Sequence, residues 1–172
     1  MELGARGLDR TTAVGDLGYD GAQIGRAAMR AALTLRNEIA ELPRLVAAAT
    51  EFAEQAGLPA DELNRLLIII DELFSNIVRY GYDQPAAHGT IAVNLSYIRG
   101  RLRLEITDDG RAFDPLAQPD PNLDLPASER PLGGLGIYFV KKLVDDLEYS
   151  RRGDCNRLVL SRRIRPTLSG AP

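Results

Sequence analysis

The sequence has a single cysteine and no apolar run near the roughly 20 residues needed to span a bilayer. With one thiol, Cys155, an internal disulfide and a metal cluster built on several cysteines are excluded, which suits a reducing cytosol. We expect this thiol to be buried or half-buried. The N-terminus also lacks the basic-then-apolar layout of a secretory signal. We therefore expect a cytoplasmic protein without membrane contact.

An excess of charge of one sign is missing as well. The chain carries 21 Lys and Arg against 24 Asp and Glu, with a net charge of −3 and the signs interspersed. This balance of charges does not predict a basic surface that would bind nucleic acid or an anionic membrane. Residues 151–165 are locally basic, and we interpret their arginines as solvated strand charges. The 172 residues, 45% of them hydrophobic, indicate one soluble globular domain with a substantial core.

Apolar periodicity predicts helices and strands in the order strand, two helices, hairpin, long loop, helix and hairpin. The expected helices cover residues 38–56, 63–82 and 135–146. The expected strands cover residues 32–36, 91–97, 102–107, 147–151 and 157–163. This order predicts an α+β fold, a mostly antiparallel sheet covered on one face by three helices.

The remaining segments show no sustained period. Residues 1–30 are expected to be a flexible N-terminal extension, residues 31–165 one folded domain, and residues 166–172 a loose tail. Within the domain, residues 108–134 contain five prolines. Loops of this length are usually functional lids or disordered segments, and both interpretations stay open.

Three polar side chains share one face of the helix predicted over residues 63–82. Glu72 and Asn76 are four residues apart, and Arg79 follows three residues later on nearly the same line. Beside a stripe of apolar residues, such groups are costly unless something pairs with them. We interpret them as a candidate binding site, with a solvent-facing stripe on an amphipathic helix as the alternative.

A second polar motif, Asp108-Asp109-Gly110, directly follows a predicted strand. Asp and Gly at a strand end most often form a turn. The functional alternative is that Asp108 accepts a hydrogen bond from a ligand amine, while Gly110 lets the backbone approach that ligand closely.

A third motif, Gly133-Gly134-Leu135-Gly136, opens the third predicted helix. Glycine is unfavourable in a helix, so three of them there need a reason. A helix N-terminus with unhindered backbone N–H groups is a natural phosphate cradle. A flexible hinge explains the glycines equally well.

In this order, the three motifs resemble the GHKL ATPase superfamily, and most closely the RsbW-like anti-sigma-factor serine-protein kinases of bacterial partner-switching systems. Residues 72–77 with 80–82 resemble the N box, residues 108–110 the G1 box and residues 134–136 the G2 box. The resemblance covers about residues 32–163 and implies a Bergerat-type two-layer sandwich that binds ATP or ADP with Mg²⁺.

The resemblance also implies a role for each polar residue. Asn76 would ligate Mg²⁺, and Glu72 would be the general base that orients a water or a protein serine hydroxyl. Asp108 would accept a hydrogen bond from the adenine amino group. Arg130, in the long loop, would reach the γ-phosphate, and Arg79 occupies a frequently basic position near the phosphates.

The glycine-rich motif and the last hairpin would complete the nucleotide site. Gly134, Leu135 and Gly136 would contact the nucleotide, and the two glycines would admit its phosphates to the helix N-terminus. Family members often have a Gly-Thr pair beside the adenine where this chain has Cys155-Asn156. The amide of Asn156 can still form the hydrogen bond, directly or through water.

The implied function is an ATP-dependent serine kinase that phosphorylates a STAS-type anti-anti-sigma partner. Free of that partner, it would sequester a sigma factor. The resemblance further implies a homodimer, through residues 33–52. Two alternatives remain: a binding module that switches partners without catalysis, and a stand-alone ATPase. A complete sensor histidine kinase is disfavoured, because the only histidine, His88, lies in a predicted loop.

Overall fold

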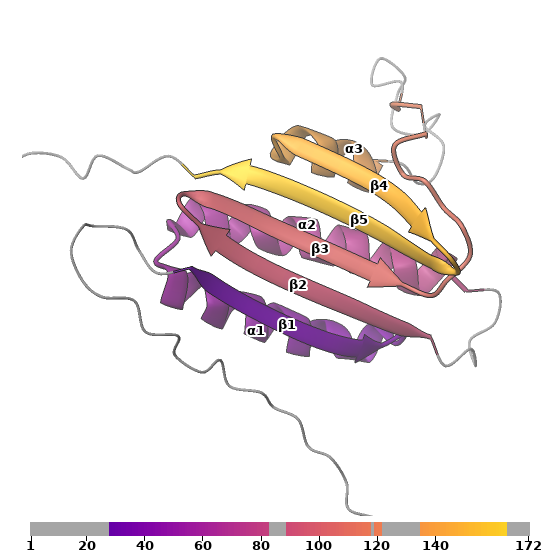
Figure 1. Cartoon of the computed structure of the whole chain (residues 1–172), viewed down its shortest axis with the longest axis horizontal. Coiled ribbons are helices and arrows are strands. Elements are labelled where there is room, and N and C mark those ends of the chain that lie inside the picture. Colours follow the sequence, from indigo (N-terminus) through magenta and orange to yellow (C-terminus); the bar gives the residue numbers. More distant parts are fainter. Residues whose placement is uncertain (1–27, 83–88, 118, 122–134, 165–172) are drawn as a thin grey trace, which may run out of the picture.

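The computed structural model describes residues 28–82, 89–117, 119–121 and 135–164. Its helices and strands follow the predicted order (Figure 1). Their bounds are β1 (Met29–Arg36), η1 (Ile39–Glu41, a 3-10 turn), α1 (Leu42–Ala56), α2 (Ala60–Tyr80), β2 (Thr90–Ile98), β3 (Arg101–Asp108), α3 (Leu135–Leu143), β4 (Asp146–Arg152) and β5 (Cys155–Arg163).

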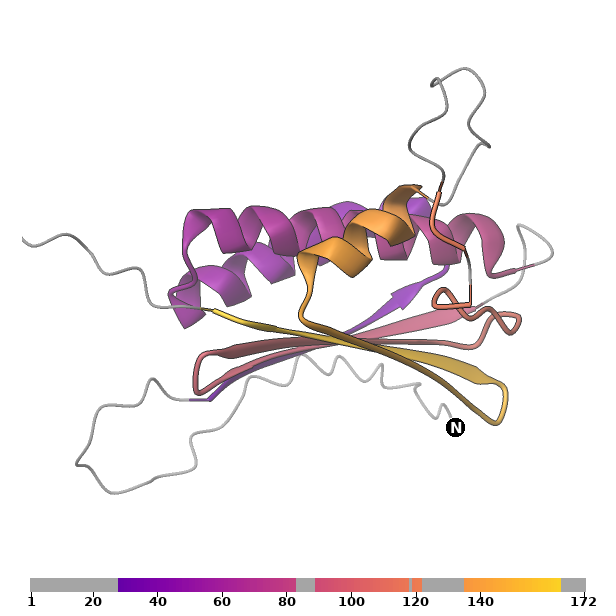
Figure 2. The same cartoon turned by 90° about the horizontal axis from the view of Figure 1, so that it is seen from above.

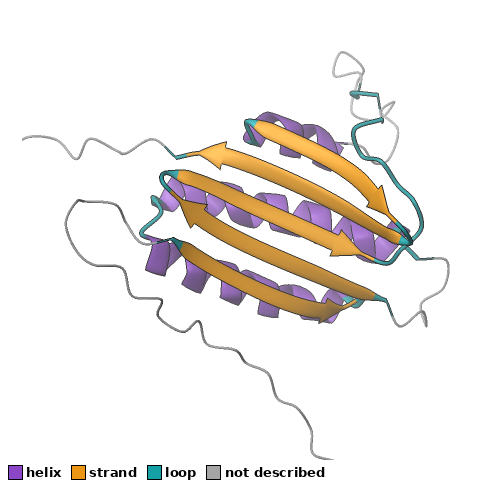
Figure 3. Ribbon diagram, in the orientation of Figure 1, coloured by secondary structure: helices purple, strands orange, loops and turns teal. Residues whose placement is uncertain are grey.

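The fold is α+β, as predicted. One antiparallel sheet has the strand order β1-β2-β3-β5-β4. Figure 2 shows that α1, α2 and α3 all lie on the same side of this sheet, so the molecule has two layers. The opposite face of the sheet is turned toward the viewer in Figure 3. None of the described helices is long and apolar enough to cross a membrane.

The core lies between the helices and one face of the sheet. Strands β2 and β3 alternate in burial, so that apolar pairs such as Val93 and Ile106 face the helices together. Helix α2 contributes a buried apolar stripe that includes Ile70 and Phe74, both fully buried. The buried side chains recur at every second residue in the strands and about every 3.6 residues in the helices. Together they form one continuous hydrophobic cluster.

The ends of the elements depart from the predicted ones for local reasons. Helix α2 begins at Ala60 because the carbonyl of Pro59 already accepts hydrogen bonds from the N–H groups of Glu62 and Leu63. Helix α1 begins at Leu42, after the 3-10 turn η1, and not at residue 38; it ends at Ala56 as predicted, because Gly57 follows with a left-handed φ of 61°. Helix α3 ends at Leu143, three residues before its predicted end, because β4 already starts at Asp146.

The first strand also begins earlier than expected. Met29 pairs with Tyr97 of β2 and packs against the core, so the expected boundary at residue 31 cuts through β1. Most of the predicted N-terminal extension, the predicted tail over residues 166–172, and His88 lie outside the described residues. So does most of the long loop. Cys155 is half-buried, as expected.

Several polar segments gather at one edge of the sheet. In Figure 1, the C-terminal end of α2, the chain that follows β3 and the turn between β4 and β5 lie at the right-hand edge, and α3 lies above the sheet with its start toward the same side. Antiparallel pairing accounts for part of this, because it places Asp108, the last residue of β3, directly opposite Asn156 near the start of β5. The motifs singled out in the sequence therefore share one end of the molecule.

Candidate functional site

The three polar residues predicted as a site lie in the C-terminal half of α2, toward this edge. Glu72 and Asn76 are half-buried, and Arg79 is exposed. The carboxylate of Glu72 lies against Gly136 in the first turn of α3: a Cβ at position 136 would overlap Glu72 Oε2 and stand 2.7 Å from its Cδ. Any side chain at position 136 would therefore displace the carboxylate. The first and third sequence motifs are in contact.

The second motif, Asp108-Asp109-Gly110, lies against the C-terminal end of α2. A Cβ at Gly110 would stand 2.6 Å from the carbonyl oxygen of Gly81 and 2.8 Å from Asp108 Oδ1. The backbone N–H of Arg111 donates to Gly81 O at 2.8 Å, and its Nε donates to Tyr80 O at 2.6 Å. Glycine at position 110 is thus required because the backbone of Gly81 approaches it closely. The close approach of a ligand to Gly110 stays a prediction.

Asn76 lies between these two contacts on α2. It stands one helical turn beyond Glu72, toward the end that carries Gly81. By its position along α2, Asn76 therefore lies between Glu72, which touches α3, and the end of the helix, which contacts the chain after β3.

Asp108 places a carboxylate in the interior of the site. It is buried, and its Oδ1 accepts hydrogen bonds from Gly110 N at 3.0 Å and Asn156 Nδ2 at 2.9 Å. Burial is the largest influence and raises the pKa of the Asp108 carboxyl above its ordinary value, although both hydrogen bonds oppose it. No described residue donates to Oδ2. That oxygen can accept a hydrogen bond from a ligand.

The amide of Asn156 is fully engaged within the protein. Its Nδ2 donates to Asp108 Oδ1 and, at 2.8 Å, to the carbonyl of Arg111. Its Oδ1 accepts from Arg151 Nη1 and from the hydroxyl of Tyr149, both at 2.8 Å. Because both amide hydrogens are used, Asn156 orients Asp108 in this arrangement. Its direct contact with a nucleotide stays a prediction.

The arginines of the basic C-terminal stretch are more than solvated charges. Arg151 donates to Gly110 O at 3.0 Å, Arg157 forms two hydrogen bonds with Glu105, and Arg162 forms two with Glu62. The interpretation as solvated strand charge is therefore wrong for the half-buried Arg157 and Arg162, whereas Arg151 is exposed as well as hydrogen-bonded. The partners lie far away in the sequence, so periodicity alone had no means of finding them.

A second hydrogen-bond network, which the sequence did not predict, holds Asp109 in the chain that follows β3. Asp109 Oδ1 accepts from the Tyr82 hydroxyl at 2.6 Å and from Thr90 N at 2.9 Å. Burial opposes ionisation of Asp109, but these bonds prevail and lower the pKa of its carboxyl. Burial, with the bond to Asp109, raises the pKa of Tyr82. The only sequence signal was the second Asp of the Asp-Asp-Gly motif.

Some predicted site residues can be placed only in part. Leu135 is the first residue of α3 and is half-buried, whereas Arg130 and Gly134 lie outside the described residues. In the described ranges, no group of three or more His, Cys, Asp or Glu side chains is placed to hold a metal ion. The prediction for Mg²⁺ needs no such group, since this ion often takes one or two protein oxygens together with phosphate and water.

Comparison with known proteins identifies the family. The sequence model of the protein family described as the histidine kinase-like ATPase domain matches residues 35–162. The chain belongs to this family. The resemblance inferred from the three motifs is thereby confirmed, and residues of all three motifs meet at one edge of the sheet.

Individual relatives of this ATPase domain are similar over part of their length. The serine-protein kinase RsbW of Bacillus cereus (strain AH187) is 29% identical over 100 residues, which cover 56% of this chain and 61% of the relative. RsbW of Bacillus thuringiensis (strain Al Hakam) is 30% identical with the same coverage. The chain thus spans about three fifths of the length of the curated relatives that it matches.

A solved structure shares the fold. The crystal structure of the RsbU and RsbW domains of Rv1364c from Mycobacterium tuberculosis superimposes with a TM-score of 0.58 at 19% sequence identity. The match covers 80% of this chain and 33% of that one. At this identity the likeness concerns the fold alone.

Proposed function

We propose that this protein binds Mg·ATP where α2, the chain after β3 and the start of α3 meet, and that it transfers the γ-phosphoryl group to a serine of a STAS-type anti-anti-sigma partner. Free of that partner, it would sequester a sigma factor, as a homodimer. Membership of the histidine kinase-like ATPase family and similarity to proteins named serine-protein kinase support this proposal. The observation that carries it is the contact of Glu72 with Gly136 at the start of α3.

The described residues fit a nucleotide at both of its ends. The Oδ2 atom of Asp108 has no described donor and can accept the hydrogen bond of an exocyclic amine such as that of adenine. At the other end, Gly136 presents no Cβ near the N-terminus of α3, where backbone N–H groups and the helix dipole favour phosphate.

The chemistry assigns different tasks to the residues of α2. Glu72, whose carboxylate lies against the start of α3, would accept the proton of the attacking serine hydroxyl or orient that hydroxyl. Asn76 would hold Mg²⁺, whose role is to neutralise charge on the transferred phosphoryl group. Arg79 and Arg130 would add positive charge near the phosphates. Asn76 should therefore be required for binding, whereas Glu72 should be required for transfer.

A non-catalytic switch is the second candidate, and one observation favours it. The Glu72 carboxylate lies directly against the backbone of α3, a place where a negative charge also stabilises a helix N-terminus electrostatically. In that role Glu72 would tie the two helices together, and nucleotide binding would change partner affinity without phosphoryl transfer.

Phosphorylation of a purified STAS-domain partner with radiolabelled Mg·ATP separates the candidates. We expect phosphoserine on the partner with wild type, none with Glu72→Ala despite nucleotide binding, and neither binding nor transfer with Asn76→Ala. The variant Arg157→Gln, in an ion pair between strands, is the control and should transfer normally. Nucleotide binding without phosphoserine in wild type would instead support the switch. Absence of nucleotide binding in wild type would refute both.

A further inference from the structure

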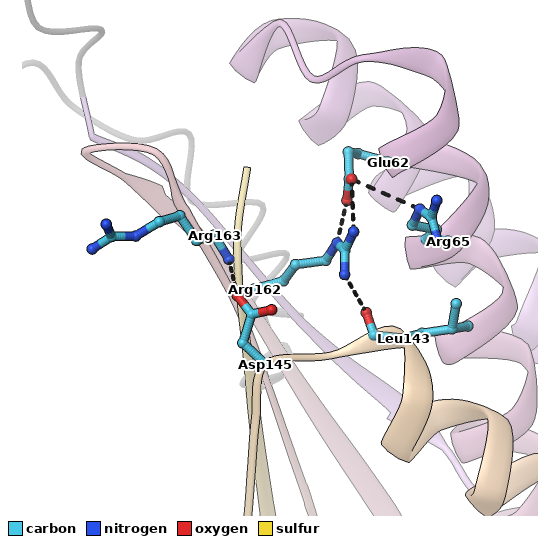
Figure 4. Close-up of polar contacts among 6 residues, drawn as sticks. All are labelled: Glu62, Arg65, Leu143, Asp145, Arg162 and Arg163. Carbon is cyan, nitrogen blue, oxygen red and sulfur yellow. Dashed lines mark hydrogen bonds and ion pairs between the residues drawn. The ribbon is translucent and has the colours of Figure 1, made fainter. Parts of the chain in front are cut away.

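Arg162, near the end of β5, reaches from the sheet to two helices at once (Figure 4). Its Nε donates to Glu62 Oε2 at 2.6 Å and its Nη2 to Glu62 Oε1 at 3.1 Å. Its third nitrogen, Nη1, donates to the carbonyl oxygen of Leu143 at 3.0 Å. One guanidinium therefore joins the first turn of α2 to the last residue of α3, using the planar fork that lysine lacks.

Each of the three groups depends on the others. Glu62 is buried, and a buried carboxylate is costly unless it is paired. The Leu143 carbonyl belongs to the last turn of α3, where carbonyls have no partner within the helix. Arg65 stands beside Glu62, but its Nε is 3.7 Å from Oε1, beyond hydrogen-bond distance. Arg162 is thus the main partner of Glu62.

The chain that leaves α3 is tied to the same strand. The backbone N–H of Arg163 donates to Asp145 Oδ2 at 2.6 Å, and Asp145 N donates to Ser161 O at 3.0 Å. The C-terminal end of α3 is consequently attached to β5 by its backbone and to α2 through Arg162.

Helix α3 needs such an attachment because it is short. It has nine residues, and only Ile137 and Val140 are buried. It runs antiparallel to α2: its first turn touches Glu72, and its last carbonyl shares Arg162 with Glu62. Both ends of α3 therefore contact α2, directly at Gly136 and through Arg162 at Leu143.

We propose that Glu62 and Arg162 are positioning residues, which hold α3 in register with α2 and so place its N-terminus for the phosphates of the nucleotide. The proposal deepens the proposed function and rests on it. Neither side chain is expected to touch the nucleotide, because both lie at the opposite end of α3 from Gly136.

The sheet provides a matched control. Arg157 and Glu105 form the same two-bond pair, at 3.1 and 2.7 Å, with a second arginine, Arg103, beside the carboxylate at 2.9 Å. Side-chain exposure is alike, 22% and 19% for this pair against 23% and 11% for Arg162 and Glu62. The control pair joins β3 to β5 and does not bridge two helices.

The experiment compares Arg162→Gln, Glu62→Gln and Arg157→Gln in the full chain, at a temperature where circular dichroism shows all of them folded. Mg²⁺ with mant-ATP is titrated, and hydrogen exchange is followed over residues 135–143. We expect the Kd of Arg162→Gln to rise about 5- to 10-fold, with faster exchange in α3. Glu62→Gln should change less, because the Gln carbonyl still accepts one bond. Arg157→Gln should stay within about twofold of wild type.

Equal Kd and equal exchange in Arg162→Gln and Arg157→Gln would overturn the proposal. If Arg162→Gln does not fold, Arg162→Lys decides, since lysine keeps the charge but cannot serve both helices and should still weaken mant-ATP binding. Wild type that binds no mant-ATP would refute the proposed function, and the exchange rates of α3 would then judge the positioning role by themselves.

Discussion

Replacing Gly136 by alanine probes the contact that joins α2 to α3. The new Cβ would overlap Oε2 of Glu72 and crowd its Cδ at 2.7 Å, so the carboxylate has to turn away. The obstacle is the end of a flexible side chain, and the backbone of α3 can stay in place. The substitution therefore moves Glu72 without removing it.

Two opposing terms set the effect on stability. Alanine gains up to about 1 kcal/mol over glycine in a helix, and less in the first turn. A displaced, off-rotamer Glu72 costs about 0.5 to 1.5 kcal/mol. The net change should lie within about 1 kcal/mol, a Tm shift of only a few degrees in a chain of this size. In a Glu72→Ala background the cost vanishes, and Gly136→Ala should raise Tm by at most about 2–4 °C.

Thermal unfolding of the two single variants and the double variant measures this coupling directly. Phosphoryl transfer adds a functional readout, because a misplaced general base costs about 100-fold in rate, whereas mant-ATP affinity should fall much less. The stability cycle needs no partner protein and no assumption about catalysis.

Additive stability changes would refute the reasoning. If Gly136→Ala shifts Tm equally with and without Glu72, the two residues do not interact in solution as they do here. Unchanged phosphoryl transfer in Gly136→Ala would show that the position of the Glu72 carboxylate is irrelevant to activity.

Three further predictions concern the rest of the site. Asn76→Ala should lose Mg·ATP binding measured by calorimetry, because the proposed metal ligand is gone. Nucleotide affinity should fall as the pH drops through the raised pKa of Asp108, since its protonated carboxyl is a poorer acceptor. Tyr82→Phe should lower stability at neutral pH by about 1 kcal/mol in urea unfolding, through loss of the bond to Asp109.

Each of these predictions has its own counter-evidence. Normal Mg·ATP binding by Asn76→Ala would remove the metal assignment. Asp108→Asn should abolish the pH step in affinity, and a step that persists would assign it to another group. Tyr80→Phe is the control for Tyr82→Phe, because the exposed Tyr80 side chain should contribute little. An equal loss in both would count against the network around Asp109.

The two carboxylates affect folding stability in opposite directions. The folded-state pKa of Asp108 is raised, so its ionisation costs stability above that pKa, and the cost disappears as the pH falls. The folded-state pKa of Asp109 is lowered, so its contribution is present above the unfolded-state pKa and is lost as the pH falls through the folded value. Acid titration of Asp108→Asn and Tyr82→Phe would separate the two.

Local patterns in the sequence were enough to predict the elements and their layers. The alternation in β2 and β3 and the apolar stripe of α2 depend on neighbours two to four residues away, which the sequence displays. The same local information marked Gly110 and Gly136 as positions that need a reason. Element ends were less certain, since Pro59 and Asp146 act through bonds and turns that periodicity does not contain.

Contacts between residues far apart in the chain were decided only by the tertiary structure. The sequence determined that Glu72, Asp108 and Gly136 are unusual, but antiparallel pairing and helix packing brought their elements to one edge. The role of Asn156 beside Asp108 and of Arg162 between two helices follows from that packing. A charge or an amide has no specific partner in the sequence, because its hydrogen bonds form only after the backbone has set their distances and directions.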